Sequence, residues 1–129
     1  MIQEILNKFP AYTNNYKIKD TDVYFLDGEN LMLFEKLRDN VYRGHFFFVD
    51  KRGKAAKDFA KECVKRMFLE NGASVLQGLT PEFEKAGRIM ARLIGGKSYG
   101  IIETINGPAE LFMLTKKEWE SNGLSNRRK

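Results

Sequence analysis

Hydrophobic and polar residues alternate in several short segments of the first half of the chain. Apolar residues in the first nine positions fit one face of a short helix, which Pro10 ends. Three strands rich in aromatic and β-branched residues are then predicted at 23–26, 31–37 and 41–49. Asp27-Gly28 and Arg38-Asp39-Asn40 separate them, and Asp-Gly between apolar runs is typical of a hairpin. The pattern predicts an antiparallel meander whose last strand is central.

After this meander, the apolar residues recur with the longer period of a helix. From Lys54 to Asn71 apolar residues recur once per helical turn, so we expect a helix that covers one face of the sheet and stops at Asn71-Gly72. Residues 74–79 are short enough to be a strand, and a strand after a helix is expected to run parallel to the strand before it.

The remaining pattern predicts a second helix and a final hairpin. Thr80 and Pro81 fit the N-cap and first position of this helix, and its apolar stripe is broken by Gly95-Gly96. Residues 99–105 and 109–115 are predicted strands joined by a turn at 106–108. The fold class is therefore α/β (α+β), a single domain over 1–129 with a mixed, mostly antiparallel central sheet and helices on both faces. Residues 121–129 are expected to form a flexible basic tail.

Length and composition fit this view and exclude several classes of protein. A chain of 129 residues is the size of one ordinary domain. No apolar run approaches the roughly 20 residues of a membrane span, and we find no secretion or lipidation signal. A soluble, cytoplasmic protein without a membrane partner is expected. One cysteine and one histidine give no metal site, and Cys63, on the apolar helix stripe, is expected to be a packed thiol.

The net charge of +5 is concentrated in one segment. Residues 51–67 contain seven cations and two anions, which equals the excess of the whole chain. A second basic cluster lies at 126–129. Nucleic-acid binding is the obvious interpretation, but the segment lacks the interleaved exposed aromatic residues of single-strand binders. Nucleic acid is therefore not the expected partner.

The basic segment begins as a turn between a strand and a helix. Gly53 lets the backbone approach a ligand closely, and Ala55 and Ala56 leave the amide N–H groups of the first helical turn open to an anion. Positive charge comes from Arg52 and its neighbours Lys51, Lys54 and Lys57. Neither G-x-x-x-x-G-K-[ST] nor G-x-G-x-x-G is present, so the pattern indicates a pyrophosphate held without a metal.

The order of elements, the stretch FVDKRGKAA at 48–56 and the later helix from Glu84 to Gly95 together resemble the GNAT acetyltransferase superfamily, roughly from Val23 to Trp119. In this family the fourth and fifth strands, here 41–49 and 74–79, splay apart to admit the pantetheine arm of acetyl-CoA. The resemblance implies that the pyrophosphate binds at Arg52, Gly53, Lys54, Ala55, Ala56 and Lys57. It also implies that the backbone of Phe48 and Val49 pairs with pantetheine.

The chain departs from the family pattern at two places. The family's loop reads R/Q-x-x-G-x-G/A; counted from Arg52, Ala55 takes the first glycine position and Lys57 the second, and the other register puts Asp50 at the arginine position. The later helix has Met90 or Ala91 where a tyrosine often protonates the departing thiolate. Tyr99 on the next strand is a candidate for that role or a half-buried core residue.

His45 is the candidate general base. Alternation places it with Phe47 and Val49 on one face of the strand, opposite Gly44, Phe46 and Phe48. A histidine there could deprotonate an ammonium acceptor, directly or through water, or could simply be packed. Glu103 is a weaker candidate base.

Two functions follow from the resemblance. The first is an acyl-CoA-dependent N-acetyltransferase that moves an acetyl group to an unidentified amine, on a small molecule or a protein, by direct attack. The second is a catalytically inert GNAT-fold structural or assembly protein. The chain's small size is also similar to GNAT-like proteins encoded among phage head-assembly genes, so phage virion proteins are possible partners, in the host cytoplasm or the virion.

Overall fold

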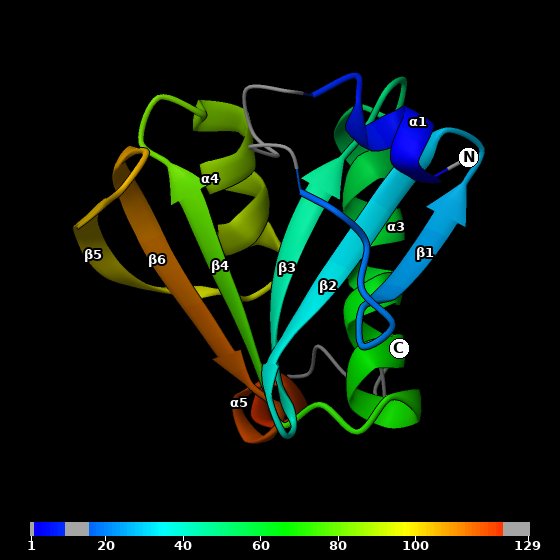
Figure 1. Cartoon of the computed structure of the whole chain (residues 1–129). Coiled ribbons are helices and arrows are strands. Elements are labelled where there is room, and N and C mark those ends of the chain that lie inside the picture. The colour runs from blue at the N-terminus through cyan, green and yellow to red at the C-terminus, as the bar shows by residue number, and fades with distance from the viewer. Residues whose placement is uncertain (1, 10–15, 123–129) are drawn as a thin grey trace.

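A computed structural model of the chain describes residues 2–9 and 16–122. Six strands form one sheet in the order β1-β2-β3-β4-β6-β5 (Figure 1). Along the chain the elements are α1 (Ile2–Leu6), β1 (Val23–Asp27), β2 (Asn30–Arg38), β3 (Val41–Phe47), α3 (Gly53–Glu70), β4 (Val75–Pro81), α4 (Lys85–Leu93), β5 (Lys97–Thr104), β6 (Gly107–Thr115) and α5 (Lys116–Ser121).

Strand directions follow the predicted pattern. β1, β2 and β3 form an antiparallel meander, and β6 pairs antiparallel with both β4 and β5. Among the strands of the described residues, only β3 and β4 pair in parallel, joined by the crossover through α3. The mixed, mostly antiparallel sheet of the sequence prediction is confirmed.

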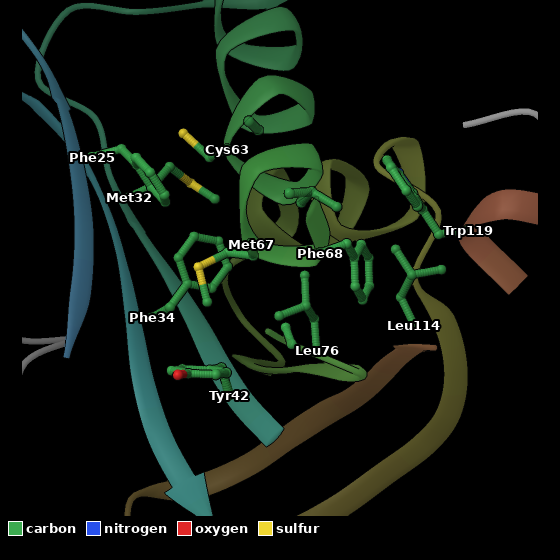
Figure 2. Packing of buried hydrophobic residues seen from close by; sticks show 13 residues of the cluster. Phe25, Met32, Phe34, Tyr42, Cys63, Met67, Phe68, Leu76, Leu114 and Trp119 are labelled. Atoms are coloured by element: carbon green, nitrogen blue, oxygen red, sulfur yellow. The ribbon is translucent and has the colours of Figure 1, made fainter. Parts of the chain in front are cut away.

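Helices pack against both faces of the sheet. Buried side chains of α3, including Val64, Met67 and Phe68, pack on one face against Met32 and Phe34 of β2 (Figure 2). Partly buried residues of α4 pack against this same cluster. On the other face Ile5 and Leu6 of α1 cover Leu31, Leu33 and Phe47. Along β2 and β3, neighbouring side chains therefore point to opposite faces of the sheet. Phe46 and Phe47 lie on opposite faces, as predicted.

The predicted helix start at 80–81 and the predicted turn at 106–108 are wrong because sheet pairing overrides the local turn and cap signals. Thr80 and Pro81 do not start a helix; they extend β4 and pair with Glu110 and Ala109 of β6, while α4 begins at Lys85. The turn expected at 106–108 is shorter, because residues 107 and 108 already belong to β6 and pair with β5. Tertiary pairing routinely outweighs such local preferences.

The last helix was not predicted. Thr115 and Glu118 form a capping box that starts α5, and Trp119 is buried with its ring 5.1 Å from that of Phe68 (Figure 2). Ser121 is the final residue of α5, so the expected tail cannot include it. Asn122 is the C-cap of α5, and residues 123–129 lie outside the described residues. The first helix ends at Leu6, before the stop predicted at Pro10, which itself lies outside the described residues. Within 2–9 and 16–122, no helix combines the length and the apolar composition needed to cross a membrane.

Candidate active site

The centre of the sheet opens between β3 and β4. Backbone pairing joins only residues 41–43 of β3 to 75–77 of β4, although β3 continues to Phe47 and β4 to Pro81. Figure 1 shows the two strands diverging from the end nearest α5. A cleft of about 620 Å³ occupies this region, and both strands contribute to its lining.

The last paired residues also join through their side chains. Arg43 Nε and Nη2 donate to Gln77 Oε1 at 2.8 and 2.6 Å, directly across the final rung of the parallel ladder. Because two donors share one acceptor, the guanidinium is held in a fixed orientation. This contact marks the closed end of the cleft.

The walls of the cleft are largely apolar. Phe34, Val64, Leu76 and Leu114 line it on the face covered by α3, and Met90 comes from α4. Gly44 faces Phe34 at a point where an added Cβ would lie 3.0 Å from the ring, so a larger residue there would require the ring to shift. The cleft thus fits an extended apolar chain better than a compact polar group.

A buried asparagine organises the turn at the open end of β3. Asn30, at the start of β2, is 3% exposed. Its Oδ1 accepts hydrogen bonds from the backbone N–H groups of Val49, Asp50 and Lys51 at 2.8, 3.0 and 3.1 Å. Its Nδ2 donates to the Asp27 carbonyl and to Asp50 Oδ1. The Val49 amide donates to the Asn30 side chain and so cannot continue the strand. β3 therefore ends at Phe47, whereas the sequence predicted an end at Val49.

The turn after β3 leads into the amino terminus of α3. Gly53 starts the helix with φ of 56°, a left-handed conformation that favours glycine, and nothing lies within 4 Å of where a Cβ would be. Arg52 occupies the N-cap without a side-chain cap, and no acidic residue is in the first turn. The first amide N–H groups of a helix have no partner within it, so this end carries partial positive charge. Gly53 and Ala56 line the cleft.

The predicted cations surround this helix end but differ in their partners. Arg52 donates to the carbonyls of Lys51 and Val49. Lys51 Nζ lies 2.7 Å from Asp27 Oδ2, and Lys54 Nζ lies 2.7 Å from Asp58. Lys51 and Arg52 line the cleft. The Lys54 pair is exposed, and exposed ion pairs of this kind contribute little, so its ammonium can exchange partners at small cost.

His45 lies on β3 within the part of the strand that β4 does not pair, and it lines the cleft. Its ring stacks on Phe47 at 6.2 Å between centroids and contacts Tyr16 at 6.5 Å. Its Nε2 is 3.5 Å from Oε1 of Glu35, a residue that sequence reasoning did not identify. The imidazole contact, together with the ammonium of Lys19, lowers the pKa of Glu35 to about 2.

The structure does not bring all predicted residues together. Tyr99 lies on β5 at the far edge of the sheet, is 56% exposed and is not among the residues that line the cleft. Glu103 is an exposed residue of the same strand. Phe48 lines the cleft and its ring packs against Phe59. Val49, Lys54, Ala55 and Lys57 are at the turn and first helical turn but do not line the cleft.

A buried carboxylate outside the cleft fixes the position of α4. Glu110 of β6 is 3% exposed and accepts from Arg88 Nε at 2.8 Å, from Arg92 Nη2 and from Ser98 Oγ. The Ser98 hydrogen bond, followed by those of the two guanidinium groups, lowers the pKa of Glu110. Because α4 supplies residues to the cleft wall, this network supports the site without lining it.

Cys63 is 1% exposed in the core cluster, as the prediction of a packed thiol requires. Burial raises the pKa of this thiol to about 12, which leaves almost no thiolate at neutral pH.

Solved structures with a similar fold are acetyltransferases. An aminoglycoside acetyltransferase AAC(6')-Ib in complex with coenzyme A and kanamycin has a TM-score of 0.60 and 17% sequence identity, over 75% of this chain and 66% of its own. A GNAT-family acetyltransferase from Bacillus anthracis has a TM-score of 0.62 and 16% identity, over 72% of this chain and 64% of its own. A GCN5-related N-acetyltransferase from Brucella melitensis has a TM-score of 0.63 and 14% identity, over 75% and 48%.

The likeness is one of structure. No family model matches the sequence, and no curated protein does. The chain spans between about half and two thirds of the length of the three structures. The sheet order, the crossover through α3 and these neighbours together show that the chain has the fold of the GNAT acetyltransferases.

Proposed function

We propose that the protein is an acyl-CoA-dependent N-acetyltransferase that moves an acetyl group from acetyl-CoA to an amine. The observation that carries the proposal is the apolar cleft between β3 and β4, which meets the uncapped, cation-rich amino terminus of α3 at its open end. An apolar slot beside an anion-binding helix terminus matches the pantetheine arm and pyrophosphate of coenzyme A. Neighbours of this fold include enzymes crystallised with coenzyme A or acetyl-CoA.

Different residues of the turn are proposed to supply the amide donors, the positive charge and the loop structure of this binding site. The amide N–H groups of Gly53, Lys54 and Ala55 are proposed to donate to the pyrophosphate, which can approach closely because Gly53 has no side chain, whereas the Ala56 amide already donates to the Arg52 carbonyl. Arg52, Lys54 and Lys57 supply positive charge there. Lys51 is held by Asp27 and, with Asn30, fixes the loop. Of the two residues expected to pair with pantetheine, Phe48 is better placed, because the Val49 amide donates to Asn30.

The chemistry proposed is direct attack. An ammonium acceptor first loses a proton to His45, and the resulting amine nitrogen forms a bond to the acetyl carbonyl carbon. The carbon–sulfur bond of the thioester then breaks, and the second amine proton passes to the sulfur so that the products are an amide and a thiol. Placing the amine against the thioester supplies much of the rate through proximity, so a single base is sufficient. Tyr99 and Glu103 have no place in this scheme, since neither lines the cleft.

One observation favours the alternative, a GNAT-fold protein that binds without catalysis, for example as a structural component of a phage head. Among the described residues, no tyrosine lines the cleft, so the thiolate-protonating tyrosine that the family resemblance leads us to expect has no counterpart there. The two functions differ in a measurable way. A transferase releases free thiol from acetyl-CoA in the presence of an acceptor amine, whereas an inert relative does not.

Thermal unfolding with millimolar acetyl-CoA tests the binding step. A ligand at 100 times its dissociation constant that binds only the native state adds about 2.7 kcal/mol. For a domain of this size the unfolding midpoint should rise by several degrees. The Arg52→Ala, Lys54→Ala double variant should lose this shift, and a Lys97→Ala, Lys117→Ala variant, which removes the same charge elsewhere, should keep it. Equal shifts in all three proteins contradict the proposed site.

A further inference from the structure

The strands that border the cleft carry a polar cluster on the face covered by α1. Glu35 of β2 lies directly opposite Arg43 in the β2–β3 register, and His45 lies opposite Leu33, so Glu35 and His45 are diagonal neighbours on one face of the sheet. Diagonal neighbours of an antiparallel pair are within reach of long side chains. The observed separation of Nε2 and Oε1 is 3.5 Å.

Each carboxylate oxygen of Glu35 has its own cationic or protic partner. Oε1 faces His45, and Oε2 lies 3.1 Å from the ammonium of Lys19. Lys19 is itself fixed, because its backbone N–H donates to Asp22 Oδ2 at 2.8 Å and its ammonium sits 5.4 Å from the centre of the Tyr16 ring. The hydroxyl of Tyr16 donates to the same Asp22 oxygen at 2.6 Å. The carboxylate is thus held in place from the side away from the histidine.

Packing fixes the imidazole on its other sides. The ring lies between Phe47, which stacks on it at an interplanar angle of 19°, and Tyr16. The side chain of His45 is 30% exposed and that of Glu35 is 22% exposed. His45 lines the cleft, while Glu35 does not. The arrangement therefore places a carboxylate behind a histidine, with only the histidine presented to the ligand space.

We infer that Glu35 is a positioning residue for His45 in the proposed acetyl transfer, holding the imidazole with Nε2–H toward the carboxylate and Nδ1 as the proton acceptor. When Nδ1 takes the proton of the ammonium acceptor, the imidazolium forms 3.5 Å from an ionised carboxylate and is stabilised by it. The proton later returns to solvent. This inference depends on the proposed function for its catalytic part, but the pair itself does not.

Several charged groups surround His45 and Glu35, and each of them affects the result of a pH experiment. Glu35 faces His45 from β2, Arg43 lies two residues away on β3 and is held by Gln77, and the segment before β1 contributes Lys19, Tyr16 and Asp22. The two cations lower the negative potential at the ring, and Glu35 is the carboxylate that contacts it. Replacing Glu35 by the isosteric, neutral Gln isolates its contribution.

The chain's single histidine makes a direct test possible, because every imidazole signal in its NMR spectrum belongs to His45. The Cε1–H resonance is followed from pH 4 to 9 in the wild type, in Glu35→Gln and in Glu35→Asp. Because Glu35 Oε1 lies 3.5 Å from Nε2, the curve of Glu35→Gln should lie at lower pH than that of the wild type, with Glu35→Asp in between. Glu29→Gln, which removes an exposed carboxylate from the β1–β2 turn, is the matched control and should leave the curve in place.

Activity supplies the second readout. In Glu35→Gln, kcat/KM for the amine should fall at least tenfold at pH 7, the acid limb of the pH–rate profile should move with the NMR curve, and KM for acetyl-CoA should be unchanged. An unchanged NMR curve, or a profile whose shape is unchanged in Glu35→Gln, overturns the inference even if acetyl-CoA binds. If acetyl-CoA fails to stabilise the wild type, it is the proposed function that fails, and Glu35 loses its catalytic role whatever the NMR curve shows.

Discussion

Asn30 should be the most sensitive polar residue of the site, although it does not line the cleft. Its side chain makes five hydrogen bonds, three of them to consecutive backbone amides of the turn after β3. Asn30→Ala removes all five. Because the turn connects the open end of the cleft to α3, we expect both the stability of the fold and the affinity for acetyl-CoA to fall.

The magnitude follows from the number and burial of these bonds. A typical intramolecular hydrogen bond contributes about 1 kcal/mol net, and a buried group left without a partner costs more. Asp50 is exposed, so water can reach part of the turn in the variant and replace some of the lost bonds. We therefore expect a loss of about 3 kcal/mol in the free energy of unfolding. For a chain of this length this corresponds to roughly 10 °C in the unfolding midpoint.

Thermal unfolding followed by circular dichroism measures this loss. The matched control is Asn71→Ala, since Asn71 makes a single side-chain hydrogen bond, to the Arg66 carbonyl at the end of α3. Its midpoint should fall by about 3 °C or less. If Asn30→Ala unfolds within a few degrees of Asn71→Ala, the hydrogen bonds of Asn30 do not hold the turn, and our account of the loop is wrong.

Three further predictions concern single residues. Gly53→Ala should lower the free energy of unfolding by about 1 kcal/mol in denaturant titrations, because alanine is strained at a φ of 56°. The space around the added Cβ is empty, so no clash adds to this loss. An unchanged midpoint would show that the turn relaxes. The pKa of Glu35 is lowered to about 2, so its stabilising effect should be complete above its ordinary value of 4.5 and be lost as pH falls from there toward 2. The difference in unfolding free energy between the wild type and Glu35→Gln should shrink over that interval, and a pH-independent difference would contradict the ion pair. Cys63 should react with a thiol reagent only as fast as the protein opens, since burial raises its pKa to about 12; rapid modification of the native protein would contradict its burial.

Much of the fold could be predicted because local pattern and tertiary pairing agree over most of the chain. The meander, the α3 crossover and the parallel β3–β4 pair follow from alternation, an Asp-Gly turn and one long amphipathic stripe. At Thr80 and Pro81 the two levels conflict: the pair is a good helix start locally, yet β6 offers it a strand partner. Thr115 and Glu118 have the spacing of a capping box, although the apolar pattern does not predict the helix α5 that they start.

The candidate site was predictable only where its residues are adjacent in sequence. The basic turn and His45 are visible as a composition change and a lone histidine. Asn30 and Glu35 were not found, because all but one of the partners named for them are 10 to 21 positions away and nothing local marks either residue as functional. Arg43 and Gln77, which close the cleft, are 34 positions apart. Such contacts depend on strand register, which a single sequence does not specify closely enough.

The central claim is that the turn after β3 and the amino terminus of α3 bind the pyrophosphate of coenzyme A. A crystal structure of the protein grown with coenzyme A tests it most directly. The account predicts pyrophosphate oxygens within hydrogen-bonding distance of the amide N–H groups of residues 53–55, with the pantetheine arm between β3 and β4. Coenzyme A bound elsewhere on the protein, or an empty cleft at saturating ligand, would contradict it.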